Sequence, residues 1–322
     1  MQHYISFGDF LDVYHKVREK KAAYFLNKFK ILPKSRIESK WDDFESTSDF
    51  WLIPEIQQSW NSKISGNPDM IYEDYVFNTY LSNKKGLKML SVGCGEGLHE
   101  RNFAKHGCFS QIDAIDFSSQ SVSNAQRFAL ENNLKINYQV GDFKKIEFEN
   151  NSYDLILFSS SLHHFENVDD TLENFVKPLL SNTGILVVFE YVGPNRLQWT
   201  KKQLDKANDL LEKLPEKYKL LINNSSIKRK VYKPGILRML LVDPSEAIDS
   251  AAIVPSLKNK FKVLEQTDLG WNILHILLKG ISHNFLNEDP ETKALITNLL
   301  EEEERFVQQE SHSDAIFGVY QK

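Results

Sequence analysis

The sequence predicts an α/β protein whose central sheet is mostly parallel and carries helices on both faces. Three observations lead to this fold class. An apolar run at 88–92 ends in a glycine-rich turn, and a helix-compatible stretch follows at 98–105. Further apolar runs of strand length recur along the chain, separated by segments long enough for a helix. Several of these runs end in an acid or a Ser/His cluster, which is typical of strands whose carboxyl ends form a ligand site.

The glycine turn after the first strand is the strongest local signal. Glycines occupy alternate positions, at Gly93, Gly95 and Gly97, and Cys94 lies between the first two. Glycine has no Cβ, so its backbone can adopt positive φ and approach a ligand closely. The helix that follows offers unpaired N–H groups at its start. A tight turn without a ligand is the alternative, and the G-x-G-x-G spacing differs from the G-x-G-x-x-G of dinucleotide-binding folds.

Four more strands are expected in the core of the sheet. Their ranges are 111–116, 136–140, 153–158 and 184–190. The second strand ends at Asp116, about twenty residues past the glycines, where a βαβ unit places a carboxylate beside ribose hydroxyls. The third is followed by Asp142 and Phe143, and the fourth by a cluster from Ser159 to His164. Because the carboxyl ends of parallel strands share one edge, we expect these residues to meet there.

Together these segments resemble those of the class I S-adenosylmethionine-dependent methyltransferases. The resemblance rests on V-G-C-G-E-G at 92–97, Asp116, G-D-F at 141–143 and L-H-H-F at 162–165, in the family's order and at its distances. It implies a Rossmann-like seven-stranded methyltransferase sheet, with the last strand antiparallel between the fifth and the sixth. It also implies S-adenosylmethionine as the cofactor.

The resemblance further implies a set of cofactor contacts. The residues expected to bind the cofactor are Gly93, Cys94, Gly95, Gly97, Asp116, Phe117, Asp142, Phe143 and Ser159. Asp116 is expected to accept from the ribose hydroxyls and Asp142 from the adenine amino group, while Phe143 covers the adenine ring. The alternatives are a helix cap for Asp116, and a turn acid followed by a core aromatic for the other two. The family often has an acid where this chain has Ser91, so the usual carboxylate near the methionine amino group is not expected from this strand.

A hydroxyl acceptor needs a base that removes its proton, whereas an amine needs only to be neutral. His163 and His164 follow the fourth strand, and either is a candidate base because an imidazole titrates near neutral pH. Glu190 and Tyr191, at the end of the fifth strand, are the next candidates. Alternatively, one histidine packs against adenine or the N-terminal segment and the other caps a helix. His275 could face the pocket from its helix, but it is expected to be a satisfied core histidine. No metal is expected, because neighbouring histidines cannot easily bind one ion together.

These patterns divide the chain into four parts. They are an N-terminal helical lid at 1–84, the cofactor-binding core at 85–193, a helical insertion that walls the acceptor pocket at 194–256, and the completion of the core sheet at 257–322. The first part is rich in aromatic residues, including Trp41, Trp51 and Trp60. They are interpreted as hydrophobic contacts with the sheet, as a lid that faces the ligand, or as both.

Hydrophobic spacing predicts further elements outside the core. Helices are expected at 8–30, 69–81, 197–213, 271–286 and 292–309, a short helix is expected to begin at Asp243, and the last strands are expected at 261–267 and 314–322. The acidic run at 301–304 is interpreted as a solvated helix face. Four side chains could hold an anionic acceptor or form a solvated basic face: Arg196, Lys230, Tyr232 and Arg238.

Composition narrows the possible partners. The chain has 322 residues, a hydrophobic fraction of 41% and a net charge of −5, so it can form a substantial core and has no global basic field for nucleic acid. Its two cysteines, Cys94 and Cys108, form no C-x-x-C pair. The first residues lack a signal-peptide pattern, and no apolar run approaches the ~20 residues that cross a bilayer. We therefore expect a cytoplasmic protein with no membrane or nucleic-acid partner, while the oligomeric state stays open.

The leading interpretation is a methyltransferase that uses S-adenosylmethionine and modifies O or N of a small polar acceptor. A finer resemblance, to a bacterial subgroup often encoded beside surface-polysaccharide or secondary-metabolite genes, points to a sugar, a glycan precursor or a natural product. It rests on W-N at 60–61, I-S-G-N-P at 64–68, G-P-N-R-L-Q-W at 193–199 and D-P-S-E-A at 243–247. The alternatives are a peptide or protein side-chain methyltransferase and a non-catalytic scaffold protein that binds the cofactor.

Overall fold

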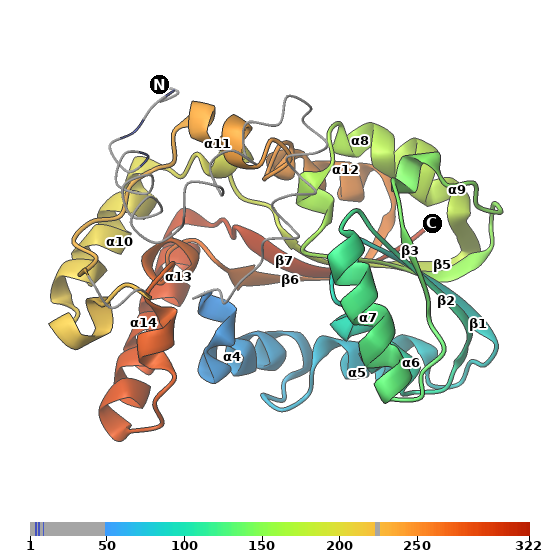
Figure 1. The fold of residues 1–322 in the computed structure, drawn as a ribbon, viewed down its shortest axis with the longest axis horizontal. Helices are drawn as coiled ribbons and strands as arrows, with labels where there is room; N and C mark the ends of the chain where they lie inside the picture. The colour runs from blue at the N-terminus through green and yellow to red at the C-terminus, as the bar shows by residue number, and fades with distance from the viewer. Residues whose placement is uncertain (1–3, 5, 7–8, 10–48, 223–225) are drawn as a thin grey trace.

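The computed structural model describes residues 4, 6, 9, 49–222 and 226–322, which build one seven-stranded sheet with helices on both faces (Figure 1). The strands are β1 (Leu87–Val92), β2 (Phe109–Asp116), β3 (Asn137–Val140), β4 (Tyr153–Ser159), β5 (Leu180–Tyr191), β6 (Lys262–Gly270) and β7 (Ala315–Gln321). Their order across the sheet is β3-β2-β1-β4-β5-β7-β6, and β7 runs antiparallel to both of its neighbours. The predicted fold class is confirmed, including the place and direction of the last strand.

Figure 1 shows α8, α9 and α12 over one face of the sheet and α5, α6 and α7 over the other. The α-helices are α4 (Pro54–Ser65), α5 (Tyr72–Val76), α6 (Leu98–Ala104), α7 (Ser119–Glu131), α8 (Val168–Thr171), α9 (Lys177–Leu179), α10 (Lys201–Lys213), α11 (Ile236–Val242), α12 (Ile253–Lys260), α13 (Leu274–Leu277) and α14 (Pro290–Glu310). Short 3-10 or π segments are η1 (Phe50–Leu52), η2 (Phe77–Leu81), η3 (Phe143–Lys145), η4 (Leu162–His164), η5 (Leu172–Val176), η6 (Asn195–Leu197), η7 (Glu216–Lys219), η8 (Ser250–Ala252) and η9 (Ser282–Phe285).

The central strands are mainly apolar because both faces of the sheet are covered. In β4, Leu155 and Leu157 enter the hydrophobic cluster shared with α4, α10 and α14. The intervening Ile156 and Phe158 enter the cluster on the opposite face, with α8 and α12. Side chains of a strand alternate between its two faces, so a doubly covered strand is a continuous apolar run. This is the pattern from which the sequence predicts these strands.

The N-terminal predictions are covered only in part. The expected helix at 8–30 and the aromatic residue Trp41 lie outside the described residues, apart from Asp9. The expected helix at 69–81 is present as α5 continued by the π turn η2. The division of the chain into four parts stays a prediction.

The expected helix at 271–286 is wrong. Only the short α13 and η9 form there, because Trp271 has a φ of 68° and Gly280 a φ of 79°. Left-handed backbone at these two positions cannot continue a right-handed helix. Ile273, Leu277 and Ile281 are fully buried, so the apolar spacing of this segment reflects packing in several directions and not one helix face.

The short helix expected at Asp243 is also wrong. The helix of this region is α11, and Asp243 follows its end. The Asp243 carboxylate accepts hydrogen bonds from the backbone and the hydroxyl of Ser245, which closes a turn. Ala247 has a φ of 46°, which excludes a helix here. Nearby, the helix expected at 197–213 begins instead at Lys201, behind a capping box formed by Thr200 and Gln203.

The acidic run on α14 is not a uniform solvated face. Glu303 is 5% exposed, and its carboxylate accepts from the backbone N–H groups of Asn272, Ile273 and Leu274. Burial raises the pKa of Glu303, against the opposing effect of these three donors. The Glu303 carboxylate, which belongs to α14, therefore accepts hydrogen bonds from the N–H groups at the start of α13 that have no partner within that helix.

Glu303→Ala should lower the free energy of unfolding by about 3–5 kcal/mol, since three buried N–H groups lose their acceptor. Denaturant unfolding of wild type and variant measures this difference. Glu301→Ala is the matched control, because the exposed Glu301 carboxylate pairs only with Arg305 among the described residues. The control should stay within about 0.5 kcal/mol of wild type. Equal stability of the two variants would show that the Glu303 carboxylate does not support α13.

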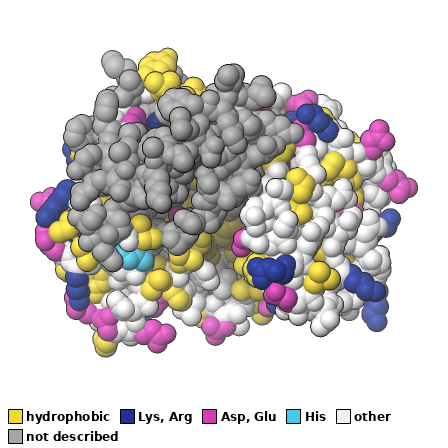
Figure 2. Space-filling view, in the orientation of Figure 1, with side chains coloured by type: hydrophobic (Ala, Val, Ile, Leu, Met, Phe, Trp, Pro, Cys, Tyr) yellow, Lys and Arg dark blue, Asp and Glu magenta, His cyan; other side chains and the backbone are white. Residues whose placement is uncertain are grey.

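The surface in Figure 2 carries Lys and Arg side chains interspersed with Asp and Glu side chains along its rim. Among the described residues that are visible on this face, positive and negative side chains alternate without a continuous basic area. Among the described residues, no helix has the length and apolar character needed to span a bilayer.

Candidate functional site

The structure brings most of the predicted site residues to one edge of the sheet. The carboxyl ends of β1, β2, β3, β4 and β5 lie at this edge because these strands are parallel. The strand order reverses between β1 and β4, which is where ligands bind in open α/β sheets.

The glycine turn after β1 needs glycine for two different reasons. Gly93, Gly95 and Gly97 have φ values of 76°, 51° and 75°. A Cβ on Gly93 would lie 2.4 Å from the Cβ of Ser161, and a Cβ on Gly97 would lie 2.2 Å from the Tyr138 hydroxyl. A Cβ on Gly95 would meet no atom of the described residues within 4 Å. The outer glycines therefore allow close packing, while the middle one faces open space that a ligand could fill.

Asp116 holds this turn from the end of β2. Its Oδ2 accepts from the Gly95 N–H at 2.8 Å, and its Oδ1 accepts from the Ser118 N–H at 2.8 Å. The helix-cap alternative for Asp116 does not apply, because the N-cap of α7 is Ser118, whose hydroxyl accepts from the Ser121 N–H. Phe117 follows Asp116 at this edge and is half-buried. Cys94 is buried, and burial raises the pKa of its thiol.

Asp142 and Phe143 differ in what they can offer a ligand. Asp142 caps η3 through the Lys144 N–H, and its side chain is 24% exposed. The Phe143 ring is buried in the core beside the rings of Phe148 and Phe165. This arrangement fits the alternative in which Asp142 is a turn acid and Phe143 is a core aromatic. Of the two side chains, only that of Asp142 reaches the surface.

Ser159, at the end of β4, contacts the N-terminal part of the chain. The Tyr72 hydroxyl donates to Ser159 Oγ at 3.3 Å. The Tyr72 ring stacks on Phe189 of β5, with centroids 5.3 Å apart. Tyr72 is 6% exposed, so α5 lies against the same edge of the sheet as the glycine turn.

Glu190 and His163 form a buried pair at the ends of β5 and β4. One carboxylate oxygen of Glu190 accepts from the backbone N–H groups of Ser161 and Leu162. The other lies 2.7 Å from His163 Nδ1. Glu190 is 0% exposed and His163 7%. The carboxylate is thus fixed by two donors and in turn orients the imidazole, whose Nε2 points away from Glu190.

The loop after α11 delivers two polar side chains to these histidines. Glu246 Oε1 lies 3.7 Å from His163 Nε2, and Ser245 Oγ lies 3.1 Å from His164 Nδ1. The loop is tied to η4 by the Ile248 N–H, which donates to the His163 carbonyl. Sequence reasoning missed Glu246, because it expected a helix here.

Arg196 has a structural role in this arrangement. Its guanidinium donates to the carbonyl of Pro244 and, at 3.5 Å, to the carbonyl of Glu246. These bonds hold the loop after α11 against the segment that follows β5. The guanidinium therefore has backbone partners. These contacts explain the position of Arg196 without an anionic acceptor.

Tyr191 and His275 form part of an aromatic wall beside the pair. The His275 ring lies 5.6–6.1 Å, centroid to centroid, from the rings of Phe50, Tyr191, Trp199 and Trp271. Burial lowers the pKa of His275 to about 3, so the ring is neutral at physiological pH. Its Nδ1 is buried without a hydrogen-bond partner among the described residues, so the expected satisfied histidine is wrong in this respect. Burial raises the pKa of the Tyr191 hydroxyl well above its usual range, and this hydroxyl donates to the Pro194 carbonyl.

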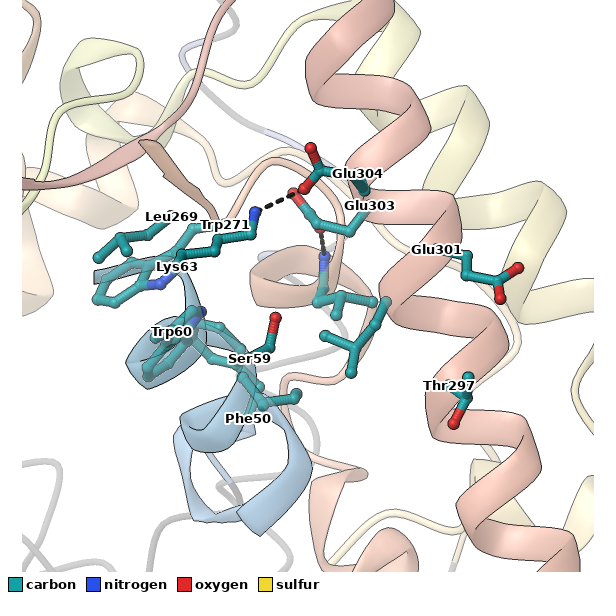
Figure 3. Close-up of a pocket in the computed structure, with 13 residues that line it drawn as sticks. Phe50, Ser59, Trp60, Lys63, Leu269, Trp271, Thr297, Glu301, Glu303 and Glu304 are labelled. Atoms are coloured by element: carbon teal, nitrogen blue, oxygen red, sulfur yellow. Dashed lines mark hydrogen bonds and ion pairs between the residues drawn. The ribbon is translucent and has the colours of Figure 1, made fainter. Parts of the chain in front are cut away.

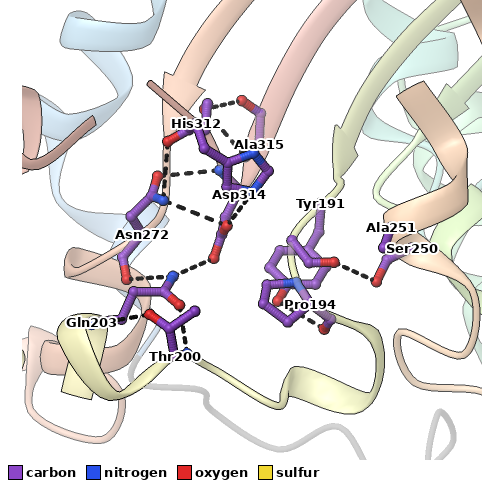
Figure 4. Close-up of polar contacts among 12 residues, drawn as sticks. Tyr191, Pro194, Thr200, Gln203, Ser250, Ala251, Asn272, His312, Asp314 and Ala315 are labelled. Atoms are coloured by element: carbon purple, nitrogen blue, oxygen red, sulfur yellow. Dashed lines mark hydrogen bonds and ion pairs between the residues drawn. The ribbon is translucent and has the colours of Figure 1, made fainter. Parts of the chain in front are cut away.

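Buried polar contacts fix the end of β5 against β7 and α10 (Figure 4). Asp314 is 0% exposed, and its carboxylate accepts from Gln203 Nε2 at 2.7 Å and pairs with His312 Nε2 at 3.1 Å. This hydrogen bond raises the pKa of His312. The Val192 N–H donates to the Asp314 carbonyl. The network therefore positions the strand end that carries Glu190.

A carboxylate that the sequence argument missed lies beneath the glycine turn. The Ser91 hydroxyl donates to Glu100 Oε1, and both residues are buried. The second oxygen, Glu100 Oε2, is buried without a hydrogen-bond partner in the part of the chain that the structure describes. Glu100 thus brings an acid from α6 to the position where Ser91 replaces the family's strand acid. The sequence signal that could have identified Glu100 is an acid in the first turn of the helix that follows the glycines.

A separate cavity of about 260 Å³ lies between α4 and α14 (Figure 3). It is lined by Phe50, Ile56, Ser59, Trp60, Lys63, Leu269, Trp271, Leu274, Thr297, Leu300, Glu301, Glu303 and Glu304. Lys63 donates to Glu304 at its rim. Neither Asp116 nor His163 contributes to its lining, so this cavity is distinct from the sheet edge described above.

Comparison with known proteins gives the family of the core. Residues 90–188 match a family model described as a methyltransferase domain. This segment is a class I methyltransferase domain. The predicted methyltransferase family, with S-adenosylmethionine as its cofactor, is confirmed for this segment.

Relatives of this methyltransferase domain carry one repeated name. A ubiquinone biosynthesis O-methyltransferase of Rickettsia bellii is 34% identical over 102 residues, which make up 32% of this chain and 41% of that protein. A protein of the same name from Rickettsia akari is 26% identical over 201 residues, 61% of this chain and 72% of that protein. The chain thus spans less than half the length of the Rickettsia bellii relative.

Phosphoethanolamine N-methyltransferase 2 of Haemonchus contortus, solved in complex with S-adenosyl-L-methionine, has a TM-score of 0.50 to this chain. The two are 15% identical, and the match covers 89% of this chain and 60% of that one. At this identity the likeness concerns the fold of the methyltransferase domain alone.

Proposed function

We propose that this protein transfers a methyl group from S-adenosylmethionine to a hydroxyl oxygen of a small polar acceptor. The observation that carries the proposal is the buried His163–Glu190 pair at the sheet edge that also carries the glycine turn. A neutral amine needs no base, whereas a hydroxyl does, so an oriented imidazole favours oxygen as the methylated atom. The name O-methyltransferase, shared by the Rickettsia relatives, supports the same choice.

The residues around the glycine turn fit the proposed cofactor. When bound, S-adenosylmethionine supplies an electrophilic methyl group together with its own leaving group. Gly95 leaves room for a ligand, since a Cβ there would meet no atom within 4 Å in the part of the chain that the structure describes. Asp116 accepts two N–H bonds, and a carboxylate offers about four lone-pair sites, so its chemistry also suits ribose hydroxyls as donors. Asp142 is the candidate acceptor for the adenine amino group.

His163 is proposed to take the acceptor's proton on Nε2. Glu190 accepts from Nδ1 and thereby fixes the tautomer in which Nε2 carries the lone pair. Glu190 is thus a positioning residue, because its other oxygen is occupied by two backbone donors. Tyr191 keeps its proton, so it is assigned to the wall of the site and not to proton transfer.

Glu100 is proposed to pair with the amino group of the cofactor's methionine part. Its free oxygen is buried and its charge is not neutralised by Ser91. Burial raises the pKa of Glu100, so the carboxyl takes up a proton at a higher pH than an ordinary glutamate. Only the ionised form attracts an ammonium group, so cofactor affinity should fall as the pH drops through this raised pKa.

Glu100→Gln should weaken binding of S-adenosylhomocysteine about tenfold at neutral pH and remove the loss of affinity on mild acidification. Calorimetric titration at a series of pH values measures both effects. Glu131→Gln on the exposed side of α7 is the matched control and should behave like wild type. An unchanged affinity and an unchanged pH profile in Glu100→Gln would exclude this role.

A transfer assay with methyl-labelled S-adenosylmethionine tests the function itself. The acceptor panel should contain hydroxylated ring compounds, free and nucleotide-linked sugars, and peptides. We expect label in a small hydroxylated compound, and a sugar or natural product remains the proposed class. Label only in peptides would favour a protein-modifying enzyme, and binding of the cofactor without transfer to any class would favour a scaffold protein.

A further inference from the structure

The acceptor side of the site also holds three side chains of the kind that bind transition-metal ions. They are His163, His164 and Glu246, and one nitrogen of each histidine and one carboxylate oxygen lie within 4.8 Å of one another. We propose that these three residues form a binding site for a divalent transition-metal ion such as Zn²⁺. The proposal does not depend on the cofactor or on the transfer reaction.

The spacing fits an ion better than a direct contact. His163 Nε2 and Glu246 Oε1 are 3.7 Å apart, which is longer than a hydrogen bond. An ion bound at about 2.0–2.2 Å to each ligand holds the ligand atoms about 3–4 Å apart. Small side-chain rotations therefore suffice to complete the site.

The sequence predicts no metal here, because neighbouring histidines cannot easily bind one ion together. Neighbouring histidines cannot share an ion in an extended strand, where successive side chains point to opposite faces. His163 and His164 lie instead in the 3-10 segment η4, and their ring centroids are 4.2 Å apart. The two imidazoles can therefore approach the same point.

The surroundings of the three ligands are those of a supported metal site. Glu190 lies 2.7 Å from His163 Nδ1, which favours the tautomer with the proton on Nδ1 and the lone pair on Nε2. Metal-bound histidines usually donate their other ring N–H to a carboxylate in this way. Ser245 contacts His164 Nδ1, and the Arg196 guanidinium holds the backbone on both sides of this serine. Imidazole and carboxylate ligands together favour zinc and its neighbours over magnesium or calcium.

A bound ion would change the site's chemistry in a defined way. His163 Nε2 has one lone pair, so it can bind either the ion or the acceptor's proton. If the proposed function holds, Zn²⁺ should therefore inhibit methyl transfer, and a chelator should restore it.

Zinc affinity of the untagged, chelator-treated full chain tests the site without any need for activity. Competition with a chromophoric zinc indicator gives the dissociation constant, and elemental analysis gives the stoichiometry. We expect one Zn²⁺ per chain for wild type, and at least about tenfold weaker binding for both Glu246→Gln and His164→Ala. Thermal melting should show that both variants are folded.

Glu301→Gln is the matched control, since it makes the same chemical change on α14, away from the three ligands. It should bind Zn²⁺ like wild type. Absence of stoichiometric zinc binding by wild type, or wild-type affinity in either ligand variant, would overturn the proposal.

Discussion

Replacing His163 by alanine should lower kcat about 10²- to 10⁴-fold and leave the affinity for S-adenosylhomocysteine within about twofold of wild type. The reason is that the imidazole is oriented by Glu190 toward the acceptor side, while the glycine turn and Asp116 keep their contacts. Steady-state rates with the acceptor found in the transfer assay, together with calorimetric titration, measure the two quantities separately. A loss in kcat without a loss in cofactor affinity assigns His163 to the chemical step.

Two further variants separate the base from its surroundings. Glu190→Gln should also lower kcat, because an amide in place of the carboxylate no longer selects the tautomer that frees Nε2. Tyr191→Phe is the control, since the Tyr191 hydroxyl donates to the Pro194 carbonyl and keeps its proton. It should retain kcat within a few-fold. If His163→Ala kept the kcat of wild type, His163 would not be the base that takes the acceptor's proton.

Replacing Asp116 by alanine should weaken S-adenosylhomocysteine binding by an estimated 1–3 kcal/mol or more, about 5- to 150-fold. The variant loses the acceptor for the ribose hydroxyls and also the two bonds that hold Gly95 and Ser118 in place. The glycine turn itself should therefore become less ordered. Calorimetric titration of the variant measures the loss, and thermal melting checks that the domain is folded.

Asp209→Ala provides the comparison for Asp116→Ala. The Asp209 carboxylate is 49% exposed on α10 and pairs with Lys213. This variant should bind S-adenosylhomocysteine like wild type. Equal affinities of Asp116→Ala and Asp209→Ala would mean that the end of β2 does not contact the ribose.

The sheet could be predicted because its strands carry their signal locally. β1, β4 and β5 each contain an apolar run, and polar groups of the site lie at the end of these runs or directly after them. The glycine turn and Asp116 are likewise marked by spacing along the chain. These features require no knowledge of which distant segments touch.

The missed residues depend on contacts between segments far apart in the chain. Glu100 becomes informative only when α6 packs against β1 and its carboxylate meets Ser91. Glu246 reaches His163 because Arg196 fixes a loop that the sequence suggested was a helix. Glu303 is buried because it caps α13 from another helix, although its neighbours in the acidic run look alike in sequence.

Calorimetric titration of S-adenosylhomocysteine into the wild-type chain tests the central claim most directly. We expect one site per chain with a dissociation constant in the micromolar range, about −8 kcal/mol, and displacement by S-adenosylmethionine. Binding of this kind would establish the carboxyl edge as a cofactor site and leave the acceptor as the remaining question. No binding by folded wild type, together with binding of a different nucleotide, would contradict the proposed methyl transfer.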